Sequence, residues 1–217
     1  MKKILILIMV GGVILLAIPI IFEPVVVKSA EATGDAAVTL TVDEGISLTV
    51  PSTNLALNQP GNMSATVSTV TNAADGASWN VKTNSADGWK LEFNTATADC
   101  LYASATGERF TDYTEASTGT PDAWSVTNAY EFGFNVEGTY ITGGTSKWGT
   151  GADCATQANK KYMGFQSTSK INVGTNNSAT NQSGENIIIC VAAEQDTIYA
   201  PSGSYSCTIT GTATSSQ

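Results

Sequence analysis

A period-two alternation of apolar and polar residues is the feature that most constrains the fold of this chain. It is clearest near the start, where six apolar residues occupy even positions: Val38, Leu40, Val42, Ile46, Leu48 and Val50. Successive side chains of a β-strand point to opposite faces, so these six share one face. Gly45 interrupts the run without changing its parity, which indicates a bend or bulge within a long strand pair.

The same alternation recurs along the rest of the chain. It marks strands at 79–81, 89–93, 130–136, 187–191 and 205–209, with shorter candidates at 65–69, 162–165 and 171–173. The first two of these runs flank a loop at 84–88 whose Asp-Gly favours positive φ, and they predict a hairpin. The strands at 187–191 and 205–209 are likewise expected to pair with each other, about a centre near Tyr199. No helical stripe follows the first 32 residues, so the pattern predicts an all-β fold. We expect an antiparallel two-sheet sandwich of about eight to ten strands, immunoglobulin-like or jelly-roll-like.

Two stretches lack this periodicity and are rich in Gly, Ser, Thr and Asp. They lie at about 95–128 and 143–161 and indicate long loop insertions. The chain outside its first 32 residues has a length that fits a single domain with these insertions, 33–217.

Residues 1–32 resemble an export signal. Lys2 and Lys3 precede an uninterrupted apolar run at 4–22, and Ala30 and Ala32 supply small side chains for a signal peptidase. We expect cleavage after Ala32. The alternative is a retained membrane anchor, because the run approaches the roughly 20 residues that span a bilayer. Either reading places the domain outside the cytoplasm, with membrane contact only through an uncleaved leader.

The charge balance argues against nucleic acid as a partner. Removing residues 1–32 takes away three of the ten basic and two of the 19 acidic side chains, which changes the net charge from −9 to −10. Binding a polyphosphate needs a basic stripe, and the only adjacent basic pair after the leader is Lys160-Lys161.

Four cysteines in an exported chain predict two disulfides, because the compartment is oxidising and the count is even. No C-x-x-C pair and no histidine is present, so a zinc site is not expected and the metal and cofactor predictions are none. Three pairings are possible on paper. If the last two strands form a hairpin, Cys190 pairs with Cys207, and Cys100 with Cys154 ties the two insertions together.

Aromatic side chains in and near the insertions are the candidate binding residues. Tyr113, Trp124 and Trp148 offer flat faces that stack on sugar rings or dock a protein. The alternative is that these rings fold inward as a small core beneath the loops.

Histidine is absent, which excludes Ser-His-Asp and Cys-His catalysis and histidine-ligated metals. No Gly-rich phosphate loop opens a helix. Paired carboxylates could still hydrolyse a glycosidic bond, but no spacing is fixed. We therefore expect a protein that is not an enzyme, with no catalytic residues assigned.

The triplet Trp89-Lys90-Leu91, followed far downstream by the segment 201–210 with its Pro, Gly, Tyr and alternating Thr, resembles the WxL-type surface domains of bacteria. The terminal strand carries Cys207 where that family has a second tryptophan motif. The resemblance implies non-covalent association with the cell wall through Trp89 and Leu91, while core packing is the other role open to both.

Taken together, these features predict an exported, non-catalytic surface protein with a structural or adhesive role. Its expected partners are an envelope polymer or neighbouring copies of the same chain. The alternative is a carbohydrate-binding module that uses the loop aromatics.

Overall fold

The computed structural model describes residues 39–51, 55, 57, 68–69, 76–126, 129–150, 154, 158–195 and 198–216. The chain divides into two compact units, residues 1–41 and 42–217, and the second holds every strand described. The predicted leader at 4–22 and its cleavage point after Ala32 lie outside the described residues. No helix within the described ranges is long and apolar enough to cross a bilayer.

The described residues form nine strands and one short helix, which confirms the all-β prediction. The strands are β1 (Ile46–Thr49), β2 (Ser68–Thr69), β3 (Ala77–Thr83), β4 (Trp89–Thr95), β5 (Thr111–Asp112), β6 (Tyr130–Glu137), β7 (Ile171–Asn176), β8 (Glu185–Gln195) and β9 (Ile209–Ser215), and the helix is α1 (Gly144–Trp148). They assemble into two sheets. The insertions predicted at 95–128 and 143–161 contain only β5 and α1 among these elements.

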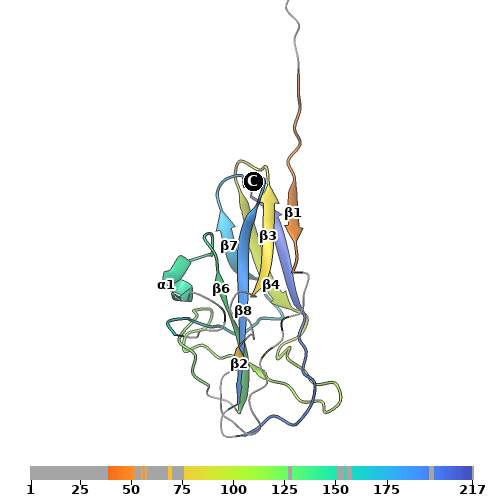
Figure 1. Cartoon of the computed structure of the whole chain (residues 1–217), viewed down its shortest axis with the longest axis vertical. Coiled ribbons are helices and arrows are strands. Elements are labelled where there is room, and N and C mark those ends of the chain that lie inside the picture. Colours follow the sequence, from red (N-terminus) through yellow and green to blue (C-terminus); the bar gives the residue numbers. More distant parts are fainter. Residues whose placement is uncertain are drawn as a thin grey trace, which may run out of the picture. The chain divides into compact units, whose positions relative to one another are not determined.

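The larger sheet has six strands in the order β1-β3-β8-β6-β5, and β2 pairs with β8 beyond the end of β3. Figure 1 shows β8 running between β3 and β6. All pairs are antiparallel except β5 with β6, which is parallel and only two residues long. The β8 segment from Ile187 to Val191 is almost continuously apolar, as expected of a strand that is covered on both faces.

The smaller sheet has three antiparallel strands in the order β7-β4-β9. Its central strand alternates as predicted: Trp89, Leu91 and Phe93 are fully buried, and the residues between them are half-buried. The Trp79 ring of the larger sheet lies 5.2 Å from the Phe93 ring of the smaller one. The two sheets thus share one hydrophobic core, which is a sandwich-like arrangement.

The predicted hairpin between 79–81 and 89–93 is wrong. β3 pairs with β1 and β8, whereas β4 pairs with β7 and β9. The loop at 84–88 therefore passes from one sheet to the other. Gly88 has the predicted positive φ, at 88°, and a Cβ there would lie 1.8 Å from the Asn176 carbonyl oxygen, so only glycine lets the chain enter beside β7.

The predicted pairing of the last two strands is also wrong. β8 belongs to the larger sheet and β9 to the smaller one, so the chain again crosses between sheets after Gln195. β9 begins at Ile209, later than the alternation suggested. Residues 162–165 form only isolated bridges, such as Phe134 with Met163, rather than a strand.

The apolar alternation at 38–50 is placed mostly in solvent. Leu40 is 83% exposed and Val42 70% exposed, and Val50 is exposed as well. Only the segment Ile46–Thr49 pairs, with β3, and Leu48 packs partly against the core. Val38 lies outside the described residues.

Candidate functional site

A polar cluster lies on the face of the larger sheet that points away from the shared core. On β6, Phe132, Phe134 and Val136 belong to that core, so the alternating residues Asn135 and Glu137 point to the opposite side. Asn135 pairs in register with Cys190 of β8. The described residues 148 and 160–161 lie against this face and form its covering segment, and β6 is consequently buried on both sides.

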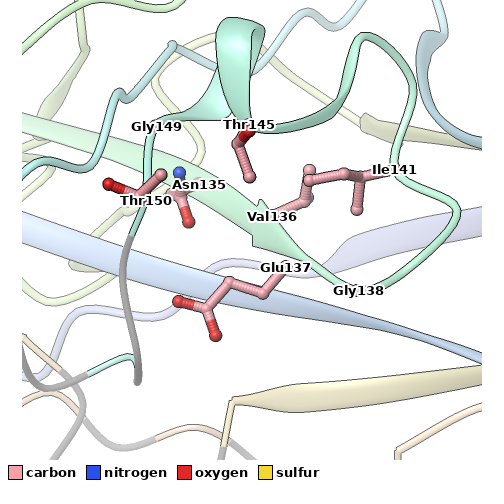
Figure 2. Close-up of a pocket in the computed structure, with 8 residues that line it drawn as sticks. All are labelled: Asn135, Val136, Glu137, Gly138, Ile141, Thr145, Gly149 and Thr150. Atoms are coloured by element: carbon pink, nitrogen blue, oxygen red, sulfur yellow. The ribbon is translucent and has the colours of Figure 1, made fainter.

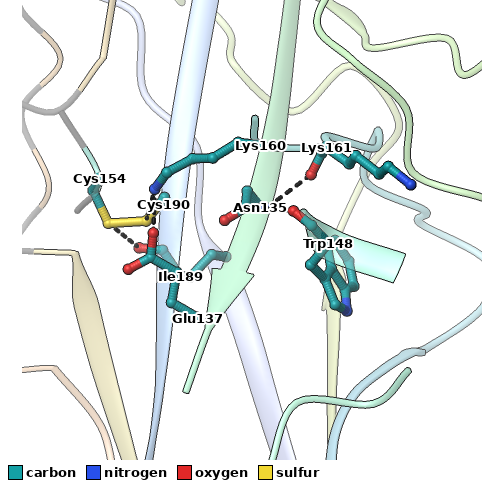
Figure 3. The surroundings of a disulfide bond; sticks show 8 residues. All are labelled: Asn135, Glu137, Trp148, Cys154, Lys160, Lys161, Ile189 and Cys190. Atoms are coloured by element: carbon teal, nitrogen blue, oxygen red, sulfur yellow. Dashed lines mark hydrogen bonds and ion pairs between the residues drawn. A yellow bond between two sulfur atoms is a disulfide. The ribbon is translucent and has the colours of Figure 1, made fainter. Parts of the chain in front are cut away.

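A buried ion pair is the centre of the cluster. Figure 3 shows Lys160 reaching over β8 toward Glu137, with its Nζ atom beside the Cys154–Cys190 disulfide. The Lys160 side chain is 1% exposed, and that of Glu137 is 20% exposed. Lys160 Nζ donates to Glu137 Oε1 and lies 3.6 Å from Cys190 Sγ. Charged lysine and glutamate side chains are seldom buried in a protein interior unless they are paired.

Asn135 fastens the covering segment to the sheet. Its Nδ2 atom donates to the carbonyl oxygens of Trp148, at 2.7 Å, and Lys161, at 2.8 Å. Its Oδ1 atom is buried and has no hydrogen-bond partner among the described residues. The Asn135 side chain therefore holds Trp148 and Lys161, which lie before and after the loop that carries Lys160, against β6.

A cavity of about 430 Å³ lies next to the ion pair. Figure 2 shows it between α1 and the end of β6, and its lining residues are Asn135, Val136, Glu137, Gly138, Ile141, Thr145, Gly149 and Thr150. Glu137 is the one ionisable residue of this lining, and two threonine hydroxyls accompany it. The cavity has room and polar partners for water beside the Glu137 carboxylate.

The structure has two disulfides, as predicted, but the predicted pairing is wrong. Cys100 pairs with Cys207, and Cys154 pairs with Cys190. The prediction required β8 and β9 to form a hairpin, and their placement in different sheets removes the proximity on which it rested. Each insertion is instead tied to a different part of the chain: the first to the segment that leads into β9, and the second to β8.

One group of possible metal ligands comes together in the described part of the chain: Glu137, Cys154 and Cys190. The two sulfur atoms are joined to each other, so neither is available as the thiolate that binds zinc.

The three candidate binding aromatics of the insertions, together with Trp89 from the WxL resemblance, are not grouped on one surface. Trp89 and Trp148 are fully buried in the main core, and Tyr113 is buried in a second cluster with Tyr162. Trp124 is half-buried and stacks on Tyr113 with ring centroids 4.6 Å apart. This placement matches the inward-folding alternative.

Hydrogen bonds hold the second aromatic cluster in place. Trp124 Nε1 donates to Glu194 Oε2 at 2.6 Å, and the Tyr113 hydroxyl donates to Asp122 Oδ1 at 2.6 Å. Burial, and next the hydrogen bond to Asp122, raises the pKa of Tyr113 well above its usual value. Tyr113 therefore stays a hydroxyl donor over the whole physiological range of pH.

An acidic pair lies at the base of the first insertion. The Asp99 N–H donates to Asp112 Oδ2 at 2.9 Å, and the Asp112 N–H donates to Asp99 Oδ1 at 2.7 Å. Burial raises the pKa of Asp112 to about 6, with a smaller raising effect from the charges of Asp99 and Glu115, although the Asp99 backbone hydrogen bond lowers it.

The Asp112→Asn variant is expected to change how stability depends on pH. The folded-state pKa of Asp112 lies above its unfolded value of about 3.9, so the folded protein binds the proton more tightly and loses stability as pH rises from about 4 to about 6. Asparagine keeps an oxygen for the Asp99 N–H but carries no charge. We expect the variant to gain stability over the native chain at pH 7.5 and to show no gain near pH 3.

Urea unfolding at both pH values, followed by tryptophan fluorescence, measures this difference. The matched control is Asp87→Asn, because Asp87 is exposed in the loop at 84–88. A gain for Asp112→Asn that is the same at both pH values would contradict the assigned cause.

The ion pair was not among the residues singled out from the sequence. Asn135 and Glu137 stand at the polar positions of an alternating strand, a pattern that indicates a solvent face, and nothing local predicts the segment that covers them. In the sequence, Lys160 stands out only as part of the basic pair Lys160-Lys161. The one pattern that could have indicated a buried polar site is a row of polar residues on a strand together with a cysteine-containing insertion.

Trp89 and Leu91, on which the resemblance to WxL-type domains depends, are fully buried on β4, which confirms core packing as one role for both. In comparisons of the chain with known proteins, no family model, no curated protein and no solved structure matched it.

Proposed function

We propose that this chain is an exported structural component of a bacterial cell surface, without a catalytic role, whose copies associate with one another. The two disulfides support the proposal, because such bonds form and persist outside the reducing cytoplasm. A low fraction of charged residues, 13%, and a Thr- and Ser-rich sequence on an all-β scaffold are also typical of extracellular modules.

The observation that carries the association is the exposed apolar edge near the N-terminus. Leu40 and Val42 continue the alternation of β1, yet both are largely in solvent. β1 itself ends the larger sheet, and no described strand is hydrogen-bonded to its outer edge, although β9 of the smaller sheet lies close to it. An exposed apolar alternation that leads in sequence into an edge strand is a template for strand addition.

A second copy of the chain is the partner that we favour. It carries both halves of the contact, an apolar strand segment and an open edge, so no other component is required. When the same strand of two copies pairs, the apolar side chains of one copy can also lie beside the apolar side chains of the other. Attachment to an envelope polymer, which the WxL resemblance implies, remains a prediction.

The carbohydrate-binding alternative has less support. It needs aromatic rings on the surface, and Tyr113 and Trp148 have theirs packed inside. Trp124 has one face stacked on Tyr113. A sugar would have to displace these contacts before it could stack.

Replacing the exposed apolar pair is the test of this association. In the chain produced with its own leader and recovered from a secreting host, Leu40→Glu with Val42→Glu is expected to weaken association on the order of a hundredfold or more. Each lost side chain contributes about 1.5 to 3 kcal/mol on burial, and about 1.4 kcal/mol is tenfold in affinity. Sedimentation equilibrium at rising concentration measures the change.

The control variant is Thr39→Glu with Thr41→Glu, which adds the same charge on the opposite face of the same segment. It is expected to leave most of the association intact. Equal loss in both variants, or a native chain that is monomeric at every concentration, would contradict the proposal.

A further inference from the structure

We propose that Lys160 and Glu137 condense to form an intramolecular amide bond, so that the folded chain carries a third covalent cross-link beside its two disulfides. The geometry points to it because the Lys160 amine and the Glu137 carboxylate are in direct contact on the covered face of the larger sheet. This inference is independent of the association proposed above.

The surroundings of the pair favour a neutral product. Lys160 Nζ is buried, and among the described residues its only other neighbour within hydrogen-bonding reach is the Cys190 sulfur at 3.6 Å. Sulfur is a weak acceptor, so within the described chain one carboxylate oxygen is the only strong partner for a group with three donors. Burying an ammonium and a carboxylate in this way costs free energy that is not fully returned by their attraction. Condensation removes both charges.

The backbone holds the two side chains against each other. Lys160 is fixed by a bridge to Gly149, and hydrogen bonds on both sides of it, from Thr150 N–H to Asn159 O and from Lys161 N–H to Trp148 O, are each 2.9 Å long. Gly149 has a φ of 83°, and a Cβ on it would lie 2.0 Å from the Asn159 oxygen, so this close approach requires glycine. Groups held in contact by a folded scaffold react with effective concentrations far above any in solution.

Glu137 is fixed equally well from the other side. It ends β6, where it pairs in register with Ile188 of β8. Figure 3 shows the Cys154–Cys190 disulfide beside the Lys160 amine, on which the Glu137 carboxylate also converges.

The reaction balances without any other reactant. The Lys160 nitrogen forms a bond to the Glu137 Cδ atom, one Cδ–O bond breaks, and the departing oxygen takes two of the three ammonium protons as water. The remaining proton stays on the amide nitrogen, and nothing is oxidised or reduced. The adjacent cavity, with Glu137 in its wall, gives the released water a place to go (Figure 2).

The cross-link would close the chain over a separation of 23 residues, a loop that contains α1 and most of the wall of the cavity. Together with the Cys154–Cys190 disulfide, it would fasten the second insertion to β6 as well as β8. Reduction of the disulfides would then leave this insertion still attached.

Peptide mapping of the full chain, after reduction and denaturation, tests the proposal directly. We expect a branched peptide that joins the Glu137 and Lys160 segments and is lighter than the sum of its parts by one water. Trypsin should also fail to cut after Lys160, because its amine is no longer free. Recovery of both segments as separate, unmodified peptides would overturn the proposal and leave an ion pair only.

Two variants separate the chemistry from the environment. Lys160→Arg is expected to abolish the branched peptide, because guanidinium is a poor nucleophile, whereas Lys161→Arg is expected to retain it. Persistence of a branched peptide in Lys160→Arg would also overturn the assignment. If Lys160→Arg does not fold, the map of the native chain still decides the question.

Discussion

Changing both Cys100 and Cys207 to alanine is expected to lower the free energy of unfolding by about 5 kcal/mol, which is the chain-entropy value for a closed loop of this size. The bond joins residues 107 apart in sequence and so restricts most of the unfolded chain. It also ties the first insertion, which has little strand pairing of its own, to the segment before β9. Urea unfolding followed by circular dichroism measures the loss.

The comparison variant changes Cys154 and Cys190, which close a shorter separation of 36 residues. The same chain-entropy relation gives a loss of about 4 kcal/mol, roughly 1 kcal/mol less than for the longer loop. An unfolding midpoint that is unchanged when Cys100 and Cys207 are removed would show that this bond is absent from the folded protein.

Replacing Trp148 by alanine is expected to cost about 3 to 5 kcal/mol, the range for deleting a buried aromatic side chain. Trp148 is 1% exposed, its ring centroid lies 5.6 Å from that of Phe134, and its Nε1 donates to the Thr142 carbonyl oxygen at 3.0 Å. The substitution therefore removes packing between the second insertion and β6 and leaves an acceptor without its donor.

Trp148→Phe is the matched control, because it keeps a ring and loses only part of the packing and the hydrogen bond. Its cost is expected to be about 1 to 3 kcal/mol. A native-like stability for Trp148→Ala, combined with lost retention on purified glycan, would instead make this tryptophan a binding residue.

The sequence predicted which residues form strands better than it predicted which strands pair. Alternation along β4 identified the buried positions Trp89, Leu91 and Phe93, because a strand with one core face must place apolar residues at every second position. Pairing depends on where each connection leads. The short loop at 84–88 has the composition of a hairpin turn, but its conformation carries the chain to the other sheet.

The same limit applies to the disulfides and to the candidate site. The number of disulfides followed from the expected compartment and the even cysteine count, whereas their pairing required the path of the chain between β8 and β9. The Lys160 and Glu137 contact depends on a covering segment that has no periodicity. Leu40 and Val42 were expected on a core face but are exposed. Alternation shows that a strand face is apolar, but it does not show what covers that face.

The Cys100–Cys207 bond has a mechanical consequence for a chain pulled from its two ends. A force on the C-terminus acts along β9 and shears it from β4, but extension must stop at Cys207. The residues between the two cysteines lie outside the covalent load path, because tension passes directly through the sulfur atoms. β7 and β8 would feel the force only through their pairing with β4 and β3, and the chain from Cys100 to Cys207 would not be extended until a covalent bond broke.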